Sequence, residues 1–132
     1  NERSTGDASG NVWVGNAGSD KLHGGGGSDT LDGGAGNDIF NGGTGEDVAW
    51  FGNESRNITV DLNIVTAQAT GAGSDRFIGI ENITGGSGND SLTGDASANV
   101  FAYYASAAAH NVLGVSVIVL GVSGKDIFAG GT

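Results

Sequence analysis

One nine-residue pattern repeats four times without a gap near the start of the chain, as GNAGSDKLH (15–23), GGGGSDTLD (24–32), GGAGNDIFN (33–41) and GGTGEDVAW (42–50). Each copy has Gly at its fourth position and Asp at its sixth. The Gly-rich first six positions suit a turn that needs positive φ, and the last three suit a short strand. The pattern predicts an all-β fold in which the chain winds as a stacked coil and each strand pairs with the next turn.

The same frame continues outside this block. A large apolar residue at the eighth position, such as Leu22 or Phe40, is expected to point inward and form a ladder with its neighbours. Two copies begin GDAS, where Asp7 and Asp95 at the second position either add a ligand or cap an array. The further copies are GDASGNVWV (6–14), GGSGNDSLT (85–93), GDASANVFA (94–102) and GVSGKDIFA (121–129).

A longer repeat contains the short one. Residues 1–14 match 89–102, and 33–44 match 121–132, both at an offset of 88 residues. We therefore interpret the chain as about one and a half copies of a long unit, taken from a larger tandem array. Residues 1–132 are expected to form one elongated fragment, with a nonapeptide block (1–50), an insert with longer strands (51–84) and a second, partly degenerate block (85–132).

The insert alternates apolar and polar residues. Ile58, Val60 and Leu62 alternate with polar neighbours, which indicates a half-buried strand. We expect the coil to continue through the insert with longer strands and looser turns. TGAGSDRFI (70–78) is a cryptic copy of the nonapeptide, with Asp75 at its sixth position.

The segment 103–120 keeps the length of 15–32 but loses the motif. Ala108 and Val117 stand where Asp20 and Asp29 stand in the first block. Either the segment has diverged into an apolar interface, or the identity of its residues is uncertain, and the sequence does not decide between the two. We predict no metal site in it.

Composition narrows the class of partner. The formal charge of −10 disfavours nucleic acid and anionic membrane surfaces, which bind basic faces. No apolar run reaches the length of a membrane span, and the absence of Cys excludes disulfides and thiolate metal sites. With 27 Gly residues and a thin core, the chain needs another source of stability.

The regular row of acids offers that source. Ca²⁺ takes six to eight oxygen ligands from carboxylates and carbonyls, and Gly lets several carbonyls converge. Mg²⁺ requires strict octahedral geometry, and zinc prefers His or Cys. The two His residues, His23 and His110, occupy unrelated positions in the frame. Several calcium ions are therefore the predicted cofactor, and the chain is expected to be largely unfolded without them.

Consecutive copies of GGxGxDxUx resemble the RTX, or hemolysin-type, calcium-binding repeats, over 6–50, 70–102 and 121–132. The resemblance implies a right-handed parallel β-roll with two nonapeptides per turn, and calcium between the loops of repeats i and i+2. Asp20 would then pair with Asp38 and Asp29 with Asp47. Carbonyls would come from Gly25, Gly27, Gly34, Gly36, Gly43 and Gly45.

The resemblance extends to weaker candidates. Asn11 facing Asp29 would give a weaker site, because an amide brings no charge. Asp90, with Gly86 and Gly88 in its loop, and Asp126 fit the motif, but their same-side partners are absent, atypical or beyond the insert. Asp75 would belong to the cryptic copy.

These observations favour a calcium-binding structural module of a secreted or cell-surface protein, such as an adhesin, surface-layer component or filament. The alternative is the carboxyl-side folding and export module of a secreted toxin, protease, lipase or polysaccharide-modifying enzyme. Its partners would be calcium and adjoining repeats, with self-association a further option. We expect no catalytic activity, because no nucleophile motif or phosphate loop is present. A weaker alternative is a glycan-binding surface with Trp13, Trp50, Tyr103 and Tyr104, most of which are better explained as core or turn residues.

Overall fold

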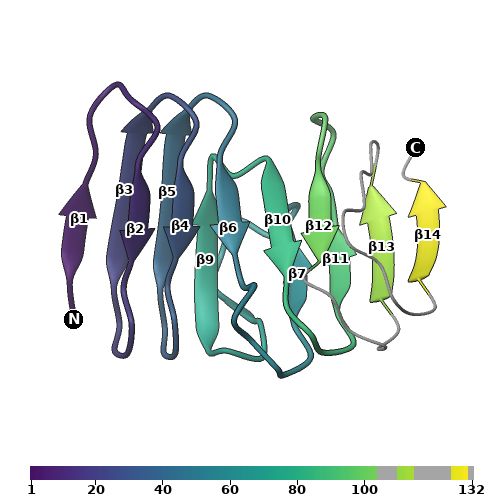
Figure 1. Cartoon of the computed structure of the whole chain (residues 1–132). Helices are drawn as coiled ribbons and strands as arrows, with labels where there is room; N and C mark the ends of the chain where they lie inside the picture. Colours follow the sequence, from purple (N-terminus) through teal and green to yellow (C-terminus); the bar gives the residue numbers. More distant parts are fainter. Residues whose placement is uncertain (104–109, 115–125, 131–132) are drawn as a thin grey trace.

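The computed structural model describes residues 1–103, 110–114 and 126–130. Within these ranges the regular elements are strands, and every strand pair but one is parallel. The strands stack as a coil from β1 at one end to β14 at the other (Figure 1). The described residues therefore confirm the predicted all-β solenoid. Among them we find no helix long and apolar enough to cross a membrane.

Three sheets make up the walls of the solenoid, in the orders β1-β3-β5-β9-β8, β12-β10-β6-β4-β2 and β14-β13-β11-β7. The strands are β1 (Arg3–Thr5), β2 (Val12–Val14), β3 (Lys21–Gly26), β4 (Thr30–Asp32), β5 (Ile39–Thr44), β6 (Val48–Trp50), β7 (Thr59–Asp61), β8 (Gln68–Ala69), β9 (Ser74–Ile78), β10 (Asn82–Gly85), β11 (Ser91–Thr93), β12 (Phe101–Tyr103), β13 (His110–Gly114) and β14 (Asp126–Gly130).

Successive coils of the first block are related by 18 residues, which is two nonapeptides. Leu22 of β3 lies beside Phe40 of β5, and Trp13 of β2 lies beside Leu31 of β4. Successive nonapeptides therefore contribute strands to the two walls in alternation. The two-repeat turn that the family resemblance implied is confirmed in this block.

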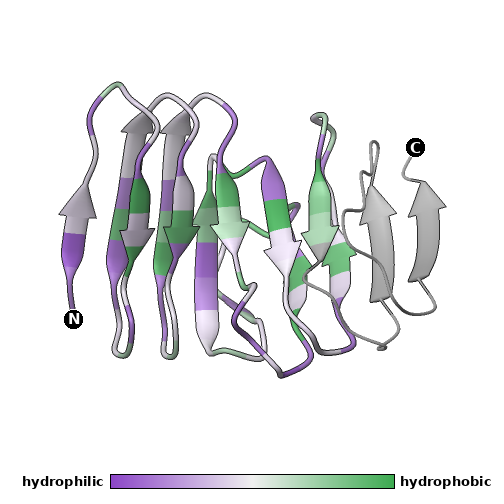
Figure 2. Cartoon of the chain, viewed as in Figure 1, coloured by the Kyte–Doolittle hydropathy of each residue, from purple (hydrophilic) through white to green (hydrophobic). Residues whose placement is uncertain are grey.

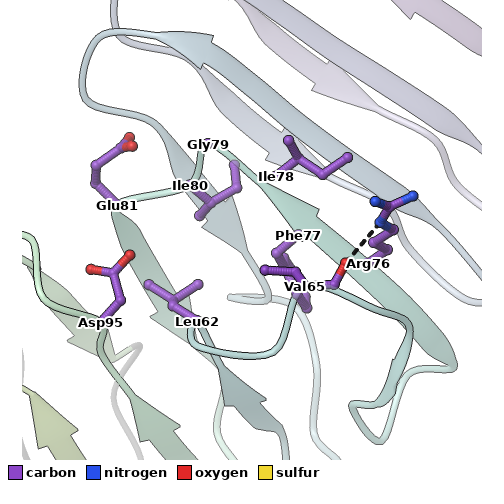
Figure 3. Close-up of a pocket in the computed structure, with 9 residues that line it drawn as sticks. All are labelled: Leu62, Val65, Arg76, Phe77, Ile78, Gly79, Ile80, Glu81 and Asp95. Atoms are coloured by element: carbon purple, nitrogen blue, oxygen red, sulfur yellow. Dashed lines mark hydrogen bonds between the residues drawn. The ribbon is translucent and has the colours of Figure 1, made fainter.

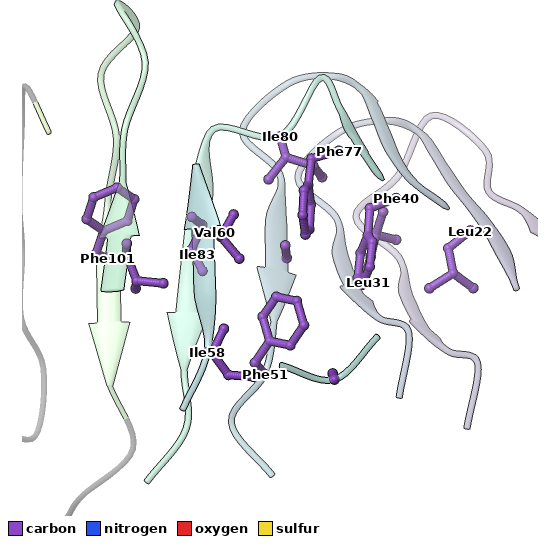
Figure 4. Close-up of a cluster of buried hydrophobic side chains, with 13 residues drawn as sticks. Leu22, Leu31, Phe40, Phe51, Ile58, Val60, Phe77, Ile80, Ile83 and Phe101 are labelled. Carbon is purple, nitrogen blue, oxygen red and sulfur yellow. The ribbon is translucent and has the colours of Figure 1, made fainter. Parts of the chain in front are cut away.

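The interior is filled by a row of apolar side chains that both walls contribute along the axis (Figure 4). Side chains alternate along each strand, so the eighth positions Leu22, Leu31 and Phe40 are buried while their neighbours are not. Phe40 stacks on Phe77 of the next coil with ring centroids 5.0 Å apart. Figure 2 shows the same alternation as hydrophobic bands across neighbouring strands. Trp13 packs against this row as well, so it belongs to the core.

The insert does not continue the coil in sequence order, so that expectation is wrong. β9 takes the place beside β5, whereas the earlier strand β7 pairs with β11 and lies further along the axis (Figure 1). The chain then returns through β8, which is antiparallel to β9. The physical reason is that the cryptic copy carries both a sixth-position Asp and an inward Phe77. It therefore fits the position next to β5 better than the Gly-poor strand β7.

The second block resumes the stacking. β10 pairs with β6 on one wall and with β12 beyond it, while β11, β13 and β14 extend the other wall. The register there shifts to 20 residues between β11 and β13 and to 16 between β13 and β14. Most of the atypical segment 103–120 lies outside the described residues. Asp126 begins β14, but its side chain is also outside the described part.

The core row generates a first prediction. Phe40→Ala should lower the free energy of unfolding by about 3–5 kcal/mol, because it opens a cavity beside the rings of Phe51 and Phe77. Ile39→Ala, on the outward face of the same strand, should lower it by less than about 1 kcal/mol. Urea unfolding at a fixed, saturating calcium concentration measures both. Equal losses in the two variants would contradict the inward ladder.

Candidate metal centre

The sixth-position acids stack above one another on both edges of the solenoid. The backbone N–H of Asp20 donates to Oδ1 of Asp38 at 2.9 Å, and that of Asp29 donates to Oδ1 of Asp47 at 2.8 Å. The N–H of Asp38 donates in turn to Oδ1 of Asp75 at 2.8 Å. Each carboxylate thus binds the backbone of the coil before it. The same-side pairs expected from the sequence are neighbours in the structure.

These carboxylates are buried but only half satisfied. Asp20, Asp29, Asp38 and Asp47 have exposed fractions of 1% or less. In each of the four, Oδ1 accepts a backbone hydrogen bond, while Oδ2 is buried without a hydrogen-bond donor among the described residues. A buried, uncompensated carboxylate oxygen is strongly unfavourable unless a proton or a cation meets it. The orphaned Oδ2 atoms are the feature that a bound cation would explain.

Backbone carbonyls converge on the same space. A Cβ atom placed on Gly15 would lie 2.8 Å from Oδ2 of Asp20 and 2.7 Å from the carbonyl oxygen of Gly33. The first Gly of each tandem repeat therefore leaves room beside the carboxylate, and at Gly15, Gly24 and Gly42 a carbonyl of the next coil lies in the same place. Carboxylate and carbonyl oxygens are the ligands that Ca²⁺ prefers.

The loops themselves stack with no space for side chains. Gly34 (φ 81°) and Gly36 (φ 132°) have left-handed backbone, and an added Cβ would collide with the carbonyl oxygens of Asn16 and Gly18 in the preceding coil. In the next repeats, Gly43 and Gly45 lie against the carbonyl oxygens of Gly25 and Gly27. The glycines named from the sequence thus align carbonyls along each edge.

Acidic side chains alone do not complete a site. Within the described ranges, no three His, Cys, Asp or Glu side chains gather closely enough to hold a metal ion. A cation between two coils would have two sixth-position carboxylates and would take its remaining oxygens from the backbone. That donor set fits calcium, and it does not fit zinc.

The comparisons with known proteins agree with this chemistry. A family model for the RTX calcium-binding nonapeptide repeat matches residues 14–49 and 77–103, in four copies. The chain contains RTX calcium-binding repeats. RTX nonapeptide repeats bind calcium ions, and their fold is the parallel β-roll seen here. None of the curated proteins and none of the solved structures gives a significant match.

Burial alters the acidity of the RTX carboxylates. Burial raises the pKa of Asp38 to about 6, and the nearby charges of Asp75 and Asp20 act in the same direction, while a backbone hydrogen bond from Asp20 opposes them. Burial also raises the pKa values of Asp47, Asp75 and Glu81. In the metal-free fold these carboxyls therefore hold protons more readily than exposed ones do.

Two departures from the RTX pattern were missed by the sequence analysis. Glu81 takes the sixth position above Asp47, whose N–H donates to Glu81 Oε2 at 2.9 Å. Thr70 takes the place of the first Gly in the cryptic copy, and its hydroxyl donates to Oδ2 of Asp75. Asp75 therefore stacks in the ladder as expected, but a hydroxyl already satisfies its second oxygen.

A sequence signal for Glu81 did exist. The nine residues 76–84 stand directly before GGSGNDSLT (85–93), and in that frame Gly79, Glu81 and Ile83 occupy the fourth, sixth and eighth positions. The overlap of this frame with 70–78 hid it. At the other end, Glu2 stacks below Asp20, because its N–H donates to Asp20 Oδ1.

The GDAS copies have self-contained loops. Asn11 faces Asp29 as predicted, since its N–H donates to Asp29 Oδ1 at 2.7 Å. Its own side-chain oxygen, however, accepts the N–H of Asp7 within the same loop. Asp95 likewise accepts hydrogen bonds from Ser97 and from the amide of Asn99. Asp7 and Asp95 therefore hold loops together, which agrees with a capping role.

Asp90 lies apart from the two ladders. It is buried, and its Oδ1 accepts the N–H of Ile58, so no carboxylate stands below it in the stack. Its loop glycines Gly86 and Gly88 approach the carbonyl oxygens of Glu54 and Arg56 in the insert. Asp90 thus has carbonyls nearby but no same-side acid in the preceding coil, as the sequence indicated.

The pKa shifts predict a pH dependence. The folded pKa of Asp38, about 6, exceeds the ordinary 3.8, so the metal-free fold gains stability from this group at low pH and loses it as the pH rises through 6. Calcium needs the ionised form. Lowering the pH from 7.5 to 5 should therefore favour the metal-free fold about tenfold from this group alone. The calcium concentration at the folding midpoint should change little, because this group is ionised at both pH values in the unfolded chain and in the calcium-bound fold.

Circular dichroism in chelator at the two pH values measures the gain of the metal-free fold. Asp38→Asn should gain less β-sheet signal at pH 5, since it has no proton to bind at that position. Equal β-sheet signal of the parent in chelator at pH 7.5 and pH 5 would contradict the burial of this carboxyl in the metal-free fold.

The stacked loops predict a glycine-specific effect. Gly36→Ala should lower the free energy of unfolding by roughly 2–4 kcal/mol, because the new methyl group meets a carbonyl of the preceding coil and the backbone stays left-handed. Gly26→Ala is the matched control, since its φ is not left-handed and its nearest neighbour, Thr44 Oγ1, is 3.4 Å away. Urea unfolding in calcium compares the two. If Gly26→Ala destabilised as much as Gly36→Ala, close stacking of the loops would not be the cause.

Proposed function

We propose that this chain is a folding module that winds into a rigid rod when calcium binds between its coils. The observation that carries the proposal is the set of four buried carboxylates whose second oxygens have no donor in the described structure. Calcium supplies the positive charge that these oxygens lack. No chemical reaction is part of the proposed role, because the repeat accounts for the acids as ligands and backbone acceptors.

The favoured sites lie between same-side loops. Asp20 and Asp38 would hold one ion, and Asp29 and Asp47 another on the opposite edge, with loop carbonyls completing each set. Asp38 and Asp75 support a weaker site, because Thr70 already donates to the outer carboxylate. Asp47 and Glu81 support a fourth site, in which a longer acid replaces Asp.

Folding and binding would be coupled. In the absence of calcium, stacking the coils buries like charges beside one another, and the core is narrow because the short strands each turn only one large apolar side chain inward. Each site with calcium at about ten times its dissociation constant adds about 1.4 kcal/mol to stability. A few such sites are comparable with the whole stability of a small domain.

The calcium requirement favours a secreted or cell-surface location, since extracellular calcium modules work with dissociation constants of about 10⁻⁴–10⁻³ M. The 88-residue repeat favours a long structural protein such as an adhesin, surface-layer component or filament. The alternative is a folding and export module beside a catalytic domain. The full gene distinguishes the two, through further copies of the long unit or through an enzyme domain next to it.

A calcium titration tests the folding role. In a chelator the chain should lack β-sheet circular dichroism, and the signal should appear cooperatively as calcium rises to millimolar concentrations. Magnesium at the same concentrations should not induce it, because the carbonyl-rich loops do not impose octahedral geometry. Equal β content in chelator and in calcium would overturn the proposal.

A matched pair of variants tests the ligand assignment. Asp38→Asn keeps an oxygen acceptor for the N–H of Asp20 but removes the charge, so the calcium midpoint should rise by about tenfold or more. Glu54→Gln removes a charge that pairs with Arg56 outside the carboxylate ladders, and it should leave the midpoint within about twofold. The number of bound ions, counted by equilibrium dialysis, should fall only in Asp38→Asn. An unchanged midpoint and ion count in Asp38→Asn would reject Asp38 as a ligand.

A further inference from the structure

The outward face of the sheet β1-β3-β5-β9 collects most of the chain's positive charge. The register places Arg3 beside Lys21, Lys21 beside Ile39, and Ile39 beside Arg76. Three of the five Lys and Arg residues of the chain therefore lie in one row across four neighbouring strands. Figure 2 shows hydrophilic bands on β1, β3 and β9 at this wall. We call this row the basic row.

Acids are missing from the same face. The outward positions of these four strands are Arg3, Thr5, Lys21, His23, Ile39, Asn41, Ser74, Arg76 and Ile78. The chain as a whole has a formal charge of −10, so this face has the opposite sign to the rest. Among the described residues, the ion pairs involve only Asn1, Asp20, Glu54 and Arg56. The cations of the basic row thus have no carboxylate partner in the described structure.

This arrangement is unfavourable for the fold alone. Like charges directly opposite each other on neighbouring strands destabilise a sheet, and Arg3 and Lys21 are directly opposite. A merely solvated surface would mix both signs, and the chain has 15 acids with which to do so. Arg76 is also held in place, because its Nε donates to the carbonyl oxygen of Val65 at 3.0 Å (Figure 3). The row therefore has the character of a binding surface.

A second row gives the surface its specificity. Thr5, His23 and Asn41 lie side by side, two residues beyond the basic row on the same strands. An open hollow of about 240 Å³ lies over both rows, with Arg3, Lys21, Ile39 and the second row in its lining. Groups in each row recur at the strand spacing of about 4.8 Å. The face thus offers cations and neutral hydrogen-bonding groups in two parallel lines along the axis.

The opposite wall is different. The outward positions of β2 and β6 include Val12, Val14 and Trp50, which line an apolar hollow of about 290 Å³ together with Asn53. No Lys or Arg stands in the outward positions of β2, β4, β6 or β10. The two walls have the same backbone, so the difference comes from side chains at the seventh and ninth positions of the repeat.

We propose that the basic row binds a linear anionic polysaccharide lying along the solenoid axis. Carboxylate or sulfate groups of the polymer pair with Arg3, Lys21 and Arg76, and its hydroxyls bond to Thr5, His23 and Asn41. A sugar polymer supplies both kinds of group in every unit. Double-stranded nucleic acid is disfavoured, because it carries one charge per about 1.7 Å of axis, which is denser than cations on strands about 4.8 Å apart can match. The proposal rests on the proposed function, since the rows exist only when calcium has stacked the coils.

The test uses one polymer backbone in three forms. Biolayer interferometry measures the binding of carboxymethyl dextran, dextran sulfate and unmodified dextran to the full chain. Free calcium is measured with a calcium electrode and adjusted to the same concentration in every sample. One or both charged forms should bind and the neutral form should not. The two charged arms distinguish carboxylate from sulfate recognition. Raising NaCl from 50 to 200 mM should weaken binding of the charged form several-fold.

Two triple variants locate the surface. Arg3→Gln, Lys21→Gln and Arg76→Gln together should weaken binding by about tenfold or more. Val12→Glu, Val14→Glu and Asn53→Glu change the net charge by the same amount on the opposite wall and should bind as the parent does. Circular dichroism of the same samples in calcium shows that each variant is folded. If the first triple variant does not fold, the test uses the binding of the single variant Lys21→Gln and the salt dependence of binding by the parent chain.

The outcomes separate the two proposals. A chain that folds in calcium but ignores both charged dextrans overturns this inference and leaves the calcium role intact. If the chain shows no calcium-dependent folding, the proposed calcium role is wrong, whatever the dextran measurements show. Equal binding in chelator, equal binding of unmodified dextran, equal binding by the basic-row variant, or equally tight binding of double-stranded DNA would each reject the polysaccharide surface.

Discussion

The buried carboxylate at the sixth position is the group on which the rest of this structure depends. Its Oδ1 ties one coil to the backbone of the coil before it, at 2.7–2.9 Å in both ladders. Its Oδ2 lies beside a loop carbonyl in a space that Gly leaves open. The first contact fixes the stacking register, while the second makes stacking unfavourable until a cation arrives. Strand pairing and the narrow core between the two walls then follow from coils that are already aligned.

The tandem repeats made most of the fold and of the carboxylate pairs predictable from the sequence. A nine-residue period with a single inward residue leaves few folds other than a solenoid, and the Asp20–Asp38 and Asp29–Asp47 pairs follow from two repeats per turn. The insert was less predictable, because alternation in 58–62 specifies a strand but not its neighbour. β7 pairs with β11, which lies 32 residues later, and no local signal encodes that choice. Glu81 escaped because it replaces Asp while keeping the backbone hydrogen bond of the sixth position. Thr70 escaped because it replaces the first Gly and adds a hydroxyl donor that the other repeats lack.

The repeat also divides its positions between two tasks. Glycines, the acid and the inward residue are committed to stacking, so changes there affect the whole rod. The seventh and ninth positions face outward on both walls, and their residue types vary. The seventh positions are Arg3, Lys21 and Ile39 on one wall and Val12, Thr30 and Val48 on the other. A chain of this kind can therefore acquire a surface of either character without altering its interior. The segregation of positive charge onto one wall is an example.

The direction of the inter-coil hydrogen bonds has one more consequence. The amide hydrogen of Asp20 is covered by the side chain of Asp38, 18 residues later, and the amide of Asp29 is covered by Asp47 in the same way. Each of these hydrogens becomes shielded from solvent only after the following turn has arrived. Pulse-labelling with deuterium, read at these amides by NMR, would therefore time the growth of the rod one turn after another and reveal from which end it assembles.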